Sequence, residues 1–201
     1  MTCRRNWIAV TSLAVLALAP DVAEAHLVTT GLGPVYDGVT HVLMSLDDLV
    51  PIVAIAILAG LNGPASGRWT LTALTIAWVA GGLAGFAAGA PPSSPVTCGS
   101  FILIGLLAAI DVRLSPAVTA LLATAVGGLH GWLNGASLAS AGLDVTGIAG
   151  IAAATFMIVT LVAASVVSLA SGWRRVALRV AGSWIAAVGL LMLGWYLRPV
   201  A

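Results

Sequence analysis

The stretch "GVTHVLMSLDDLVPIVAIAILAG", residues 38–60, decides the fold because it joins an apolar run to three ionisable side chains. From residue 49 onward it carries no charge and suits the hydrocarbon core of a bilayer. The part before it holds His41, Asp47 and Asp48. A carboxylate at the centre of a membrane helix costs about 2.5–3.5 kcal/mol on insertion scales. Two adjacent acids at this depth therefore indicate a functional site.

The whole chain has the composition of an integral membrane protein. Of its 201 residues, 60% are hydrophobic and 7% are charged, and the mean hydropathy is +1.10. Soluble domains carry about 25% charged residues. The hydrophobic segments are long enough for membrane helices, so the fold class we predict is an all-α integral membrane protein.

The same composition argues against several functions. A net charge of +1 and the absence of lysine give no basic patch, so we expect no nucleic-acid partner. The sequence has no GxxxxGK[ST] loop for a nucleotide. Serine, histidine and aspartate occur without a spacing that implies a catalytic triad, so we do not predict an enzyme.

The first 25 residues have the pattern of a secretory signal peptide. Arg4 and Arg5 precede an apolar stretch, residues 7–19, and a small-x-small cleavage motif occupies residues 23–25. Thirteen apolar residues are few for a span of about twenty, so we predict cleavage over the alternative of an uncleaved anchor. Cleavage would make His26 the first residue of a chain that starts in the periplasm.

Six hydrophobic segments follow, and we expect residues 26–201 to form a bundle of six transmembrane helices. Turn and helix-stop residues separate the segments, including a proline-rich loop at residues 91–95 and a loop at residues 134–144. A kink is expected at Pro51, whose missing N–H frees a carbonyl one turn earlier. The expected spans are 38–60, 69–89, 97–111, 116–134, 145–170 and 176–197.

The arginines predict the orientation of this bundle. Five of them fall in the three loops on one side of the expected topology, whereas Arg198 falls on the other side. By the positive-inside rule the first side is cytoplasmic, which places both mature termini in the periplasm of a bacterial inner membrane. The five are Arg68, Arg113, Arg174, Arg175 and Arg179.

Two expected spans carry glycines at intervals of four residues, about one helical turn. Such a face lets two helices approach closely. The two sets are Gly81, Gly85 and Gly89, and Gly127, Gly131 and Gly135.

The ionisable residues of the first span suggest a metal site. In a straight helix, His41 and Asp48 would lie about 10.5 Å apart, too far for one ion with bonds of about 2.0–2.5 Å. We therefore predict an outer station of His41 with His130 of the fourth span, and a deeper station of Asp47 and Asp48. Asp37 shares the helical face of His41 and is a weaker candidate.

Other roles stay open for these residues. Both histidines fit hydrogen-bonded packing, and the two aspartates could accept backbone or hydroxyl hydrogen bonds. For Asp37 and Asp144 we favour solvated or helix N-terminal roles, and for Cys98 a small buried side chain. His26, as a new N-terminus, could chelate an ion through its amine and imidazole, or could be a processed end with no such role.

The first span resembles the signature of the HupE/UreJ family, which reads His-Pro-x-x-Gly-x-Asp-His. His41 and Asp47 match its first histidine and its aspartate. Asp48 stands where the family has the final histidine, and Val42 and Ser45 replace the proline and glycine.

Two later segments extend the resemblance over nearly the whole mature chain. Residues 100–109 resemble the serine-containing third span, although the acid that usually precedes it is missing. Residues 130–137 resemble His-Gly-x-Ala-His-Gly-x-Glu, with His130 in place. Asn134 replaces the second histidine and Ser137 the glutamate.

The resemblance implies a membrane accessory protein associated with hydrogenase and urease that acts as a permease for nickel. Imidazole and carboxylate ligands also suit other divalent ions, so copper, cobalt, zinc and manganese stay open, and we expect no tightly bound cofactor. Partners would be membrane lipid, the metal ion, and a second copy or a membrane-complex subunit. The alternative function is a non-transporting metal-binding or structural subunit of a larger complex.

Overall fold

The computed structural model describes residues 29–89, 94–169 and 171–198. The expected leader, the cleavage motif and His26 lie outside the described residues. Within them the chain is helical and contains no strand. The helices are α2 (Pro34–Met44), α3 (Leu46–Leu61), α4 (Pro64–Ala88), α5 (Ser94–Ala109), α6 (Pro116–Ser140), α7 (Gly147–Leu169) and α8 (Gly172–Tyr196).

An all-α membrane architecture is confirmed, whereas the count of six spans is not. In the described residues, α4, α6, α7 and α8 are long and apolar enough to cross a membrane. Helices α2 and α3 qualify together as one broken span, bent by 73°. Helix α5 is apolar but, at 16 residues, shorter than α4, α6, α7 and α8.

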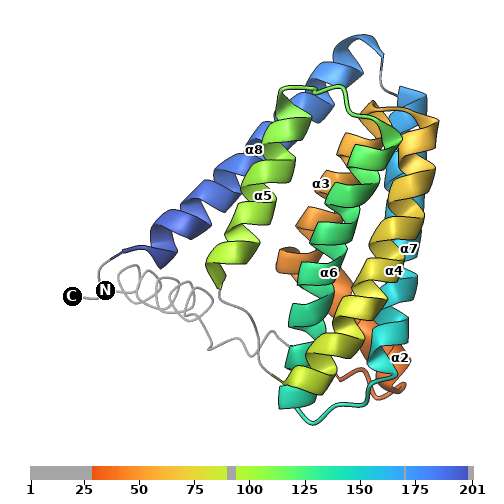
Figure 1. Cartoon of the computed structure of the whole chain (residues 1–201), viewed down its shortest axis with the longest axis vertical. Helices are drawn as coiled ribbons and strands as arrows, with labels where there is room; N and C mark the ends of the chain where they lie inside the picture. Colours follow the sequence, from red (N-terminus) through yellow and green to blue (C-terminus); the bar gives the residue numbers. More distant parts are fainter. Residues whose placement is uncertain (1–28, 90–93, 170, 199–201) are drawn as a thin grey trace, which may run out of the picture.

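From α3 onward, successive helices run in alternating directions. Figure 1 shows the α3–α4, α5–α6 and α7–α8 junctions at one end of the molecule and the α6–α7 junction at the other. The five arginines predicted to share a side belong to the first three junctions or to the turns beside them. We call this end the arginine end.

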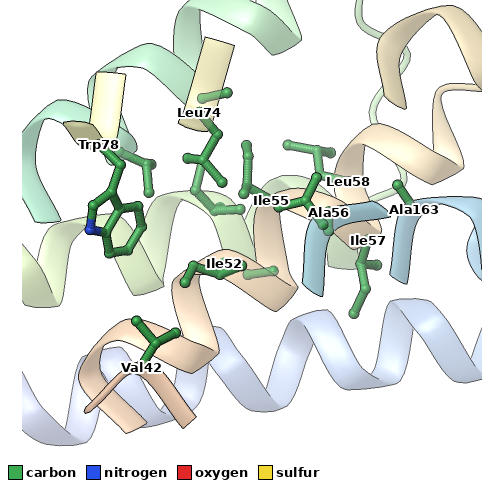
Figure 2. Packing of buried hydrophobic residues seen from close by; sticks show 14 of the residues in the cluster. Val42, Ile52, Ile55, Ala56, Ile57, Leu58, Leu74, Trp78 and Ala163 are labelled. Carbon is green, nitrogen blue, oxygen red and sulfur yellow. The ribbon is translucent and has the colours of Figure 1, made fainter. Parts of the chain in front are cut away.

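Helix α3 forms the centre of the core. From Pro51 to Leu61 every residue except Val53 is buried, which explains why its sequence is apolar on all sides. Figure 2 shows its side chains packed among those of α4 and α7; the labelled residues include Ile52, Ile55, Leu58, Leu74, Trp78 and Ala163.

The glycine faces join α4 to α6. A Cβ atom on Gly131 would overlap the carbonyl of Trp78, and one on Gly135 would overlap the carbonyl of Gly82. The predicted close helix contact is therefore confirmed for both sets except at Gly89. That residue instead ends α4 in the left-handed conformation, with φ 68°.

Two predicted boundaries are wrong. The fourth span continues to Ser140, because Asn134 bonds to its own helix and Gly135 packs against α4 instead of forming a turn. The first span breaks at Ser45, which is extended (φ −85°, ψ 105°), and not at Pro51. Pro51 lies in the second turn of α3, where its missing N–H removes a single helical bond.

Helices α5 and α8 form a second body beside the main bundle. They pack mainly on each other and reach the rest chiefly through α3. At the arginine end, Arg175 donates two hydrogen bonds to Asp111 (2.6 and 2.7 Å), and Arg179 donates one to the Ala109 carbonyl (3.0 Å). Arg175 also reaches the Leu61 carbonyl (3.4 Å), so this cluster fastens α8 to the ends of α3 and α5.

Replacing Gly135 by alanine is expected to destabilise the protein, because the new methyl group meets the Gly82 backbone. Overpacking of this kind costs about 1–3 kcal/mol. The matched control is Gly128→Ala on the same helix, where nothing lies within 4 Å of the new methyl group. Thermal unfolding in detergent should give a lower Tm for Gly135→Ala and an unchanged or higher Tm for Gly128→Ala. Equal Tm values would contradict the packing described.

Candidate functional site

A buried carboxylate, that of Asp48, lies in the first turn of α3 and is 4% exposed. Its Oδ2 lies 3.3 Å from His41 Nε2, and its Oδ1 lies 3.5 Å from His130 Nδ1. Asn134 also donates a hydrogen bond from Nδ2 to Oδ1 (2.9 Å). An isolated carboxylate in an apolar interior would be very costly, and these groups, together with the helix N-terminus, offset that cost.

The break at Ser45 brings His41 next to Asp48. In a straight helix the two residues would lie about 10.5 Å apart along the axis. The 73° bend between α2 and α3 reduces the separation of their side chains to 3.3 Å. The separation expected for a straight helix is therefore wrong for these two residues, whereas the assignment of metal stations stays a prediction.

His130 reaches the site from α6 and is 1% exposed. Its Nε2 lies 3.0 Å from the Ser100 hydroxyl of α5, and that hydroxyl donates to the Thr97 carbonyl (2.7 Å). The Ser100 oxygen can then accept a hydrogen bond from a protonated Nε2, and Nδ1, which faces Asp48 Oδ1, offsets the buried charge only when it carries a proton as well. The Trp78 ring of α4 packs beside the imidazole, with centroids 5.7 Å apart.

Asp47 does not join this cluster. It is exposed, and it lines a pocket of about 390 Å³ between α3, α5 and α8. Its neighbours there include Thr97, Cys98 and Met192. A rotation of about 100° per residue explains why adjacent acids face different helices. Cys98 is buried, as expected.

The remaining predicted acids occupy helix N-terminal or loop positions. Asp37 accepts hydrogen bonds from the N–H and the hydroxyl of Thr30, both 2.6 Å long. Asp144, in the turn before α7, accepts from the N–H (2.8 Å) and hydroxyl (2.7 Å) of Thr146, and these bonds lower its pKa. Neither carboxylate lies in the Asp48 cluster.

The donor atoms around Asp48 can be tested against metal geometry. Two ligands bound at about 2.0–2.2 Å to one ion lie about 2.8–3.6 Å apart, and both imidazole–carboxylate separations fall in this range. The two imidazoles, however, approach different oxygens of Asp48. Among the described residues, no three His, Cys, Asp or Glu side chains surround a single point. Shared coordination would therefore need an imidazole or the carboxylate to rotate.

Two further polar atoms near the site lack partners. Within the described part of the chain, Asn134 Oδ1 and Trp78 Nε1 are buried without a hydrogen bond. These two atoms belong to residues that contact His130 and Asp48, and an acceptor and a donor left free there could hold ordered water.

Sequence reasoning did not assign roles to Asn134, Ser100 or Trp78. The sequence held a clue to the first two, since in the motif resemblance Asn134 replaces a histidine and Ser100 lies in the serine-containing span. The sequence held no clue to Trp78, because its place beside His130 follows from the packing of α4 on α6.

Comparison with known proteins agrees with the motifs. The HupE / UreJ protein family matches residues 13–192 of the chain. Protein HupE of Rhizobium leguminosarum bv. viciae is 29% identical over 185 residues, which cover 91% of this chain and 95% of that protein. No solved structure matches the chain significantly. The family resemblance predicted from the motifs is confirmed.

Replacing Asn134 by leucine is expected to lower the free energy of unfolding by about 1–3 kcal/mol, because the Asp48 carboxylate loses a buried donor. The control is Thr124→Val on the exposed face of α6, where the hydroxyl donates to Ala120 of its own helix. Denaturant titration in detergent micelles measures both. A loss no larger for Asn134→Leu than for Thr124→Val would show that this hydrogen bond contributes nothing to stability.

Proposed function

The chain belongs to the HupE/UreJ family, and we propose that it is an inner-membrane permease for a divalent transition-metal ion, with nickel as the favoured cargo. The observation that carries the proposal is the cluster of His41, Asp48 and His130 in the interior of an apolar bundle. Ionisable side chains inside membrane helices are costly and typically mark a transport path.

The chemistry of the donors fits this cargo. Imidazole nitrogens suit nickel and its neighbours, and a carboxylate offsets part of the charge of a cation that leaves water. The bond between His130 Nε2 and Ser100 would remain while Nδ1 bound the ion. A second-shell oxygen on the other ring nitrogen is the usual arrangement for a metal-binding histidine.

We further propose that the ion enters from the end opposite the arginines. The pocket beside Asp47 lies between the starts of α3 and α5 and the end of α8, away from the arginine end. Asp47, exposed there, would attract a cation before it reached Asp48. With the arginine end in the cytoplasm, a potential of 100 mV favours entry of a dication by about 4.6 kcal/mol.

Replacing Asp48 by asparagine is expected to reduce nickel uptake by tenfold or more, in the range of about 10–100-fold typical for damage to a metal site. The assay is initial uptake into proteoliposomes that contain only this protein and an internal chelating dye. Asp144→Asn, which removes a carboxylate outside the cluster, is the matched control and should transport normally. Wild-type protein that binds nickel without accumulating it would instead indicate a non-transporting subunit.

The two adjacent acids should differ in this assay. Asp47→Asn is expected to raise the KM for nickel while leaving the maximal rate nearly unchanged, because Asp47 only attracts the ion. Asp48→Asn should lower the maximal rate. Equal losses of maximal rate in both variants would refute the separate roles.

A further inference from the structure

Helices α7 and α8 follow each other in the chain but make almost no contact. Between them, over a floor formed by Ile57 of α3, lies a groove of about 460 Å³ near the arginine end. Its α7 wall runs from Leu161 to Leu169, about 12 Å along the helix. Asp111 and Arg175 hold α8 against α3 and α5, which keeps it away from α7.

The groove is apolar apart from one charge at its mouth. The hydroxyl of Ser165, which lines the groove, donates a hydrogen bond to the Leu161 carbonyl of its own helix (2.7 Å). Arg174 is the single charged residue of the lining. It is exposed, and no hydrogen bond or ion pair to its guanidinium occurs in the parts of the chain that the structure describes.

We propose that this groove binds an anionic phospholipid, with an acyl chain between α7 and α8 and the phosphate at Arg174. The chemistry fits because the space is apolar over its length and basic at one end. Trp173, 76% exposed beside Arg174, is the kind of residue that sits at the headgroup level. Basic pockets between membrane helices recognise anionic headgroups on the cytoplasmic side.

A neighbouring groove repeats this arrangement. It measures about 340 Å³, lies between α4 and α7, and carries Arg68 at the same end. Its walls are in contact, since α4 packs on α7, whereas the walls of the α7–α8 groove are not. The α7–α8 groove is therefore the better candidate for a bound lipid, because its two walls are not in contact with each other.

Native mass spectrometry of the full chain, delipidated and then mixed with phosphatidylglycerol or phosphatidylcholine, tests the proposal without metal or transport. Wild-type protein should retain phosphatidylglycerol about fivefold better, as one arginine near an anionic lipid implies. Arg174→Gln should abolish this preference. Ala177→Phe, which fills the groove, should reduce retention of both lipids.

The matched control is Arg113→Gln, an exposed arginine at the same end that lines neither groove. It should keep the wild-type preference. Equal retention of the two lipids by the wild type would overturn the proposal, as would an equal loss in Arg113→Gln. A lipid-free dimer that Ala177→Phe dissociates would show instead that a second copy covers the groove.

Discussion

The hydrogen-bonded environment of one buried carboxylate organises the centre of this protein. Asp48 begins the most buried helix, and it is tolerated there because His41, His130 and Asn134 surround it. Those partners come from the preceding helix and from α6, so the same contacts stabilise both the bend at Ser45 and the docking of α6. Removing the charge would remove these contacts as well as the candidate ligand.

Two departures from the family pattern meet in this environment. By the motif resemblance described above, Asp48 and Asn134 both stand where the family has histidine, and in this structure they are hydrogen-bonded to each other (2.9 Å). A carboxylate that replaces an imidazole needs a donor opposite it, and an amide supplies one without adding charge. Two replacements that look unrelated in the sequence are therefore complementary in the structure, because the amide of Asn134 donates to the carboxylate of Asp48.

The rest of the molecule consists of a tightly packed part, which includes α4 and α6, and a loosely attached part formed by α5 and α8. Glycines let α4 and α6 pack tightly enough to hold Trp78 against His130. Helices α5 and α8 are instead joined to the bundle chiefly through α3, through the hydrogen bond from Arg175 to the Leu61 carbonyl and through the contact between Ser100 and His130. This arrangement leaves the pocket beside Asp47 at one end and the α7–α8 groove at the other.

The sequence alone determined the properties that depend on composition and local period. High hydropathy required helices in a membrane, glycines at every fourth position required one close helix contact, and the arginines marked one end of the bundle. His41, Asp48 and His130 were recognisable because ionisable groups are costly in lipid. Tertiary structure alone decided that Asp48 lies between the two histidines while Asp47 faces another pocket. That outcome depends on the break at Ser45 and on the partners supplied by α5 and α6. Helical periodicity predicts neither of them, because it assumes an unbroken helix and says nothing of its neighbours.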